Sequence, residues 1–193
     1  MKRRIVVTSL LASLLCCFGC GEGHADQYKT ADIYRDLRQQ VFTLDPGKIG
    51  LTPASSNQVW GVVMETGYPK AVATLVTISD GTVSLYFSNG GAMIGAGQHE
   101  GPRNACKAFL ALSQGYLEQA SPTKTFPLPK QGYTRFYFLT FQGIHTAEFK
   151  EDDLGNNRLP LSPLFHKAHE VITQVRIVDE KRRSEQPAPP DRR

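Results

Sequence analysis

The chain has 193 residues and a formal net charge of +4, of which Lys2, Arg3 and Arg4 supply three charges. The last fourteen residues, EKRRSEQPAPPDRR, hold five basic and three acidic side chains, so the remainder carries about −1. A nucleic-acid-binding protein needs a clustered basic face, which this balance excludes outside the tail. Three of the four cysteines lie within the first 20 residues, which excludes a disulfide framework.

Residues 1–19 are predicted to be a signal peptide. The basic start is followed by an uncharged apolar run over 5–18, which is shorter than the roughly 20 residues of a membrane-spanning helix. Gly19-Cys20 ends this run, and the segment resembles a bacterial lipoprotein signal peptide, although Cys17 and Phe18 depart from the usual pattern. The resemblance implies acylation of Cys20. Gly21, in place of Asp, implies sorting to an outer membrane where the cell has one.

An alternative is ordinary signal cleavage after Ala25, because Gly23-His24-Ala25 places small residues where such a site requires them. The charged Glu22 fits that alternative poorly, and we therefore favour the lipoprotein. The remaining organisation is predicted as a linker over 20–30, a single domain over 31–179, and a tail over 180–193. The tail is Pro-rich, charged and almost without apolar side chains, so it is expected to be disordered.

The first element of the domain is predicted to be a helix over 31–42, with Ile33, Leu37 and Val41 on its apolar stripe and Thr30 as its N-cap. Strands are predicted to follow over 59–65, 72–79, 82–88 and 91–96. Asp80-Gly81 and Asn89-Gly90 indicate hairpins between them. The second is expected to be a type I′ turn, with positive φ at both residues.

The glycine-rich segment after Asn89 is interpreted as a turn and return strand rather than a nucleotide-binding loop. Gly90 and Gly95 have the spacing of a phosphate-binding loop, but Ala96 stands where lysine is required. The dinucleotide pattern that begins at Gly95 ends on Glu100 instead of glycine. Glycines here could still allow the backbone of a partner to approach closely.

A middle helix is predicted to open at Pro102, with Cys106 and Phe109 on its apolar stripe, so Cys106 is interpreted as a structural residue. Strands over 133–141 and 144–149 follow, and the first has apolar residues on both faces, as a central strand does. Ser162-Pro163 is expected to open the last helix.

The order of these elements, α-ββββ-α-ββ-α, predicts an α+β fold: a single domain with a mainly antiparallel sheet of about six strands and three helices. This inventory resembles profilin-like and roadblock-like modules, whose strand order between helices differs. The likeness is at the level of fold and does not fix a function.

His99, Glu100 and Arg103 form the candidate binding site, because they lie where the glycine-rich segment meets the middle helix and free N–H groups could receive an anion. His166 and His169 lie three residues apart on the last helix, but the spacing of a zinc-protease motif is absent. These histidines are interpreted as solvated boundary residues. No metal and no cofactor is predicted.

The sequence therefore predicts an exported, lipid-anchored envelope protein that acts as a non-catalytic binding or accessory module. Its expected partners are the membrane, through the lipid on Cys20, and another envelope protein. The alternative is an envelope hydrolase with a site near His99 and Arg103, or near His166 and His169.

Overall fold

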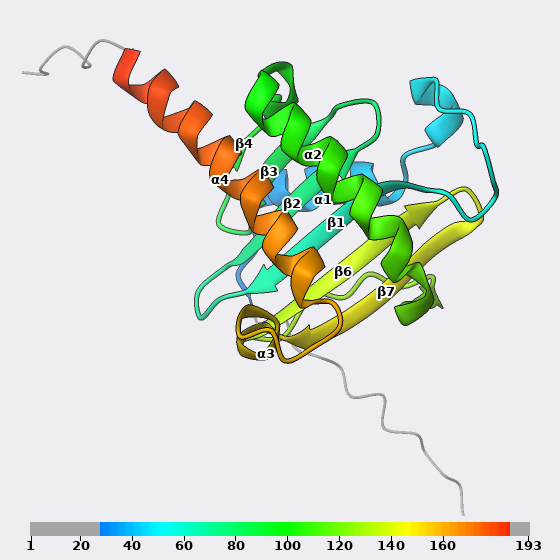
Figure 1. The fold of residues 1–193 in the computed structure, drawn as a ribbon. Coiled ribbons are helices and arrows are strands. Elements are labelled where there is room, and N and C mark those ends of the chain that lie inside the picture. The colour runs from blue at the N-terminus through cyan, green and yellow to red at the C-terminus, as the bar shows by residue number, and fades with distance from the viewer. Residues whose placement is uncertain (1–27, 186–193) are drawn as a thin grey trace, which may run out of the picture.

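The computed structural model describes residues 28–185, so the predicted signal peptide and Cys20 lie outside the described residues. Seven strands form one antiparallel sheet in the order β4-β3-β2-β1-β6-β7-β5 (Figure 1). The strands are β1 (Val59–Gly67), β2 (Val72–Ile78), β3 (Val83–Phe87), β4 (Ala92–Met93), β5 (Ser121–Thr123), β6 (Tyr133–Thr140) and β7 (Gly143–Lys150). The predicted α+β class is confirmed.

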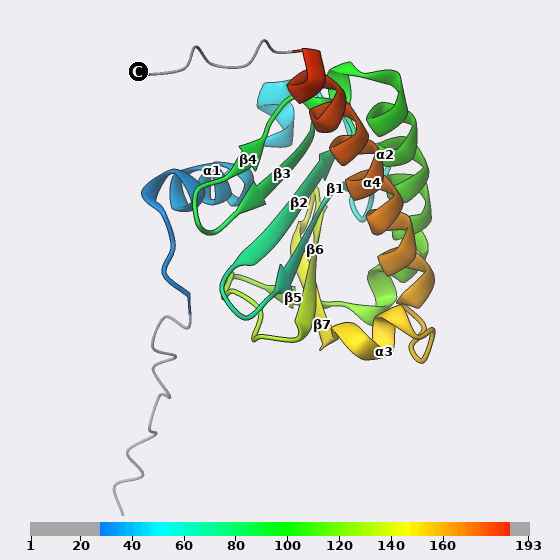
Figure 2. The same cartoon turned by 90° about the vertical axis from the view of Figure 1, so that its left-hand side faces the viewer.

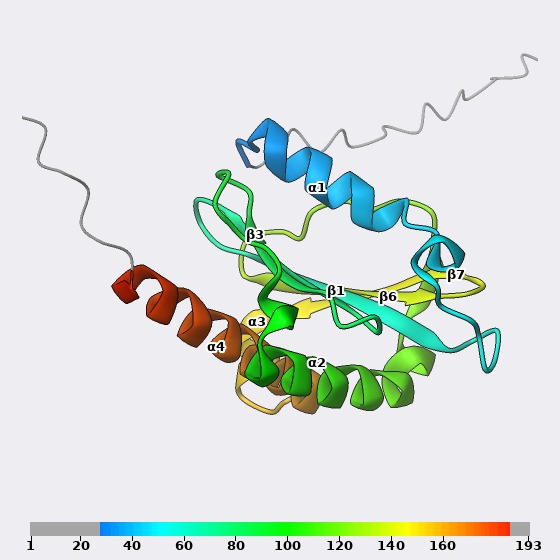
Figure 3. The ribbon, with the colours of Figure 1, turned by 90° about the horizontal axis from the view of Figure 1, so that it is seen from above.

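Helices cover both faces of this sheet, which gives the domain three layers (Figures 2 and 3). One face carries α1 (Asp32–Phe42), and the other carries α2 (Glu100–Ser113) and α4 (Ser162–Glu185). The shorter helices are α3 (Glu151–Gly155) and the 3₁₀ turns η1 (Pro46–Ile49), η2 (Ala96–Gln98) and η3 (Gln114–Gln119).

The alternation of side chains along the strands divides the interior into two cores. Phe136 and Phe138 of β6 point toward α2 and α4, while Tyr137 and Leu139 point toward α1. All four side chains are fully buried, and β6 lies between β1 and β7. The prediction of a strand that is apolar on both faces is therefore confirmed.

Both predicted hairpins form, but the type I′ turn at Asn89-Gly90 is wrong. Gly90 has φ of 102°, whereas Asn157 is the sole non-glycine residue with positive φ between 28 and 185. Gly90 N donates to Phe87 O, and Phe87 N donates to Gly91 O. This is the pattern of a type I turn followed by a glycine bulge, in which one residue alone needs positive φ. The turn at Gly81 has the same pattern of bonds.

The predicted face of α1 is partly wrong. Ile33 is 52% exposed, while Tyr34 is buried and leads the face that packs on the sheet. The N-cap position is Ala31, without a side-chain cap, and not Thr30. Tyr34, and not Ile33, points toward the sheet. The sheet beneath α1 contains buried polar side chains, and the Tyr34 hydroxyl reaches one of them, Thr74.

The boundary between the domain and its tail lies later than predicted, since α4 continues to Glu185 instead of ending near 179. Ion pairs one turn apart join Asp179 to Arg183 and Lys181 to Glu185 along this extension. Such pairs stabilise a helix that has little apolar surface to bury. The expectation of a disordered tail is therefore wrong for residues 180–185, and the rest of that tail lies outside the described residues.

The strand β5, the helix α3 and the three 3₁₀ turns were not predicted. The strand β5 has three residues, includes Pro122 and pairs with β7 at the edge of the sheet. The helix α3 is a single turn that follows β7 directly. Middle helix α2 begins at Glu100, two residues before the predicted opening at Pro102.

Candidate functional site

The three residues of the predicted binding site lie at the start of α2, and all three are exposed. Arg103 is committed to the local backbone, because its Nε donates to Gly97 O at 2.9 Å and its Nη2 donates to Gln98 O at 2.8 Å. The guanidinium thus clamps η2 onto α2. Two of its five N–H donors are thus used within the protein.

These three side chains do not converge on one hollow. His99 lines a small hollow of about 90 Å³ against α4, which it shares with Asp179 and Arg182. Arg103 lines a different, open hollow of about 580 Å³, together with Asp80 and Lys107. Glu100 lines neither hollow. The structure therefore places the predicted residues side by side along the chain without building a shared site from them.

The two histidines of α4 have different surroundings. The Nε2 atom of His166 lies 3.0 Å from Asn157 Oδ1, at the surface. His169 packs its ring 4.4 Å from that of Phe165, and its Nε2 is buried without a hydrogen-bond partner among residues 28–185. Burial, and then the neighbouring His166, lower the pKa of His169, which favours the neutral ring. No group of three or more potential metal ligands occurs within the described residues.

Cys106 is part of the core, as predicted. Its side chain is 1% exposed and its Sγ donates to Ile78 O at 3.8 Å. Burial raises the pKa of the thiol to about 11, so the reactive thiolate is disfavoured at neutral pH.

An apolar groove of about 520 Å³ lies between α4 and the sheet. Its floor is formed by side chains from three neighbouring strands: Ala73, Leu85, Phe87 and Met93. Tyr68, from the connection between β1 and β2, and His169 and Ile172, from α4, form its walls. In Figure 1, α4 passes over the side of the sheet that holds β3 and β4, and its C-terminal end extends past that edge.

The charged side chains along this groove pair with one another on α4. Arg183 Nε lies 2.7 Å from Asp179 Oδ2, and Arg176 Nη2 lies 3.9 Å from Glu180 Oε1. Each pair joins opposite charges one helical turn apart. The rim therefore offers little uncompensated charge, and the contacts available on the floor are apolar.

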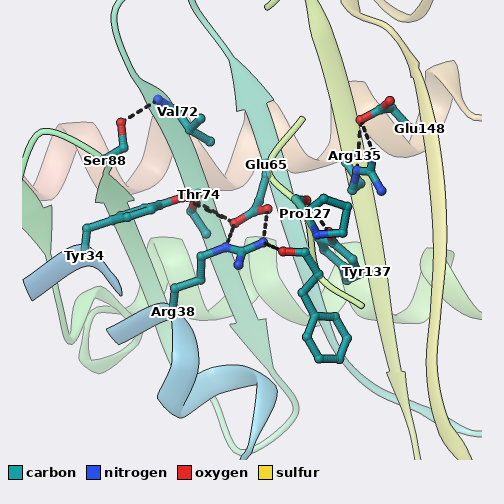
Figure 4. A network of polar contacts seen from close by, with 11 residues as sticks. Tyr34, Arg38, Glu65, Val72, Thr74, Ser88, Pro127, Arg135, Tyr137 and Glu148 are labelled. Carbon is teal, nitrogen blue, oxygen red and sulfur yellow. Dashed lines mark hydrogen bonds and ion pairs between the residues drawn. The ribbon is translucent and has the colours of Figure 1, made fainter. Parts of the chain in front are cut away.

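A buried polar network joins α1 to the sheet, and Figure 4 shows its members. Glu65 of β1 is fully buried, and its carboxylate receives two hydrogen bonds from Arg38, from Nε at 2.7 Å and from Nη2 at 2.9 Å. Arg38 Nη2 also donates to Phe126 O at 2.7 Å. The Tyr34 hydroxyl lies 2.8 Å from Thr74 Oγ1, which donates to Glu65 Oε1 at 3.1 Å.

This network satisfies the charges of Glu65 and Arg38 within the protein and leaves no open face for a substrate. Burial and the charge of Glu65 raise the pKa of Tyr34, so its hydroxyl stays protonated. The sequence interpretation did not select Glu65 or Arg38. The signal was a carboxylate in the otherwise apolar strand VWGVVMETG, because a charge in a buried strand requires a partner.

Fold and surfaces together define a single-domain α+β protein in which helices cover both faces of an antiparallel sheet. Comparison with known protein families, with curated proteins and with solved structures finds no match for this chain. Within residues 28–185, no helix is both long enough and apolar enough to cross a membrane.

Proposed function

We propose that the chain is exported, is held in the cell envelope by a lipid on Cys20, and acts there as a non-catalytic binding or accessory module. Support for export and lipidation comes from the basic start, the apolar run and Gly19-Cys20. Support for binding comes from one observation in the folded domain. This domain has a groove whose floor is apolar, while His99 and Arg103 line different hollows and, of the polar candidates, only His169 lies along the groove.

The chemistry of the groove favours an apolar segment of another envelope polypeptide as its occupant. Phe87 and Met93 offer polarizable, adaptable contact surface, which suits side chains of varied shape. Because the charged side chains of α4 pair with one another, they offer no net attraction to a charged group on that segment. A lipid that confines the domain to the membrane surface would raise the effective concentration of such a partner, so weak binding could suffice.

The lipid anchor has a direct test. Replacing Cys20 with Ser should stop incorporation of labelled fatty acid and move the protein out of the membrane fraction, because the thiol is the site of acylation. The measurement is mass spectrometry of the mature protein together with fractionation of cells. A wild-type protein that carries no lipid and begins at Asp26 would show that the ordinary signal peptide is correct instead.

The binding groove is tested by selecting peptides from a random library on the mature protein. Selected peptides should be apolar, and Met93→Gln should weaken their binding by roughly tenfold, since about 1.4 kcal/mol of contact energy is a factor of ten. Titration calorimetry measures the effect. Ile177→Gln is the matched control, because Ile177 is an exposed apolar residue of α4 that does not line the groove.

The hydrolase alternative is tested with the same preparation. Ester, phosphate, peptide and glycan substrates are screened, and His99, Arg103, His166 and His169 are each replaced by Ala. Turnover well above background that one of these changes abolishes, in a protein that remains folded, would overturn the non-catalytic proposal.

In the peptide selection, two results would overturn the groove as the binding surface. One is that the selected peptides are charged, and the other is that Ile177→Gln weakens binding as much as Met93→Gln.

A further inference from the structure

One end of the sheet is built from four chain segments that contact one another, and it lies at the bottom in Figure 2. Gly132 N donates to Gly67 O at 2.7 Å, and Glu151 N donates to Gly132 O at 2.9 Å. The Tyr28 hydroxyl lies so close to Gly67 that a Cβ there would be 2.5 Å from it. These contacts join the start of the described chain, the β1–β2 connection, the segment before β6 and the end of β7.

Each of these four segments carries an exposed lysine, and we call Lys29, Lys70, Lys130 and Lys150 the lysine end. None of the four forms an ion pair with another residue between 28 and 185. Of the acidic residues that follow Lys150, Asp152 and Asp153 both pair with Arg158, at 2.7 and 3.0 Å, and Glu151 forms no ion pair among the described residues. With Arg158, Glu151, Asp152 and Asp153 counted, five positive and three negative side chains leave the lysine end with a net charge of +2.

This end is also where the chain enters the folded domain. Cys20 lies eight residues before Tyr28, so a lipid on Cys20 would hold the lysine end within about 30 Å of the membrane. Tyr68, 39% exposed, belongs to the same β1–β2 connection as Lys70. Lysine side chains and an exposed aromatic ring are the groups that bind at the headgroup level of a bilayer.

We propose that the lysine end is a membrane-docking surface that binds the anionic headgroups of the lipid bilayer. This proposal rests on the lipid anchor for its geometry. Basic side chains near the bilayer add an electrostatic contribution to that of the lipid and favour one face of the domain against the membrane. That contribution acts within roughly 10 Å of the surface at moderate salt, which is within the reach of the linker.

The test uses the mature chain from position 20 with Cys20→Ser, which keeps every described residue and carries no lipid. It should sediment with vesicles of phosphatidylcholine and phosphatidylglycerol and remain in solution with phosphatidylcholine alone. Replacing the four residues of the lysine end with Gln should weaken binding to the anionic vesicles at least roughly tenfold, because each lysine near the surface adds to affinity. High salt should weaken the unsubstituted protein in the same way.

A control variant carries Gln at four other exposed lysines, Lys48, Lys107, Lys124 and Lys181, and has the same net charge. It should bind nearly as well as the unsubstituted chain. Equal loss in both variants would show an effect of net charge and overturn the proposal, and so would an absence of preference for anionic vesicles. Should the fourfold variant misfold, as judged by circular dichroism, Lys70→Gln with Lys130→Gln gives the same comparison against Lys48→Gln with Lys107→Gln.

Failure of this inference and failure of the lipid anchor are distinguishable. Selective binding of the unlipidated chain to anionic vesicles, in a protein whose wild type has no lipid, would keep the docking surface and remove the anchor. A lipidated wild type whose unlipidated form ignores headgroup charge would keep the anchor and remove the docking surface.

Discussion

Replacing Arg38 with Met should lower the free energy of unfolding by about 3–5 kcal/mol, the usual cost of breaking a buried ion pair by removing one partner. The substitution keeps the aliphatic volume of the side chain but removes both hydrogen bonds to Glu65 and the bond to Phe126 O. Glu65 is fully buried, so its carboxylate would lose its cation with no access to water. Urea denaturation followed by circular dichroism measures the change.

Arg35 provides the matched control, since it lies one turn before Arg38 on the exposed side of α1 and pairs with Asp32 at the surface. Arg35→Met should change the free energy of unfolding by no more than about 1 kcal/mol. Combining Arg38→Met with Glu65→Met should recover most of the stability lost in the single variant, because neither charge is then buried alone. Equal effects of Arg38→Met and Arg35→Met would show that the buried pair does not stabilise the native protein.

The same network explains how α1 is placed on the sheet. Apolar contacts alone would allow the helix to slide, because Leu37, Val41 and Phe42 meet a broad apolar face. The bidentate bond from Arg38 to Glu65 and the contact from Tyr34 to Thr74 each require one register. Tyr137 adds a bond to Pro127 O at 2.6 Å, which holds the segment before β6 against the same face.

Sequence patterns were sufficient for the parts of the fold that local chemistry determines. Alternation along 82–88 and the apolar residues on both faces of 133–141 predicted their strands and their orientation, because side chains in a strand point to opposite faces. The elements that were missed depend on contacts remote in sequence. Residues Ser121–Thr123 become β5 through pairing with β7, and nothing in their composition favours a strand.

Composition misled the prediction for residues 180–185. Few apolar side chains there argued for disorder, but the spacing of opposite charges at four residues, as in Asp179 and Arg183, was also visible in the sequence. The prediction of the candidate site failed for a different reason. Nearness of His99, Glu100 and Arg103 along the chain did not determine where their side chains point, and Arg103 turned toward two carbonyl oxygens of the preceding turn.

Gly97→Ala should be among the most destabilising small substitutions in the domain, lowering the free energy of unfolding by about 3 kcal/mol, the upper end of the usual range for overpacking. A Cβ at this position would lie 1.8 Å from Gly81 O and 3.2 Å from Val83 N. Both are backbone atoms of the β2–β3 hairpin, where Gly81 already has φ of 97°, so neither side can move without disturbing the turn. The β2–β3 hairpin occupies the space that a side chain at position 97 would need. This contact explains the glycine at position 97 without a bound partner or phosphate.

Gly115→Ala is the control, because Gly115 is exposed and an added Cβ there meets no atom within 4 Å. This change should alter stability by less than about 0.5 kcal/mol. Hydrogen exchange provides a second, local readout: in Gly97→Ala, amides of η2 and of the β2–β3 turn should exchange faster than those of α4, since the strain is confined to the contact between η2 and the hairpin. The hydrogen bond from His99 N to Ala96 O closes η2. If Gly97→Ala were as stable as Gly115→Ala and exchange at His99 N were unchanged, η2 would not pack on the hairpin in solution.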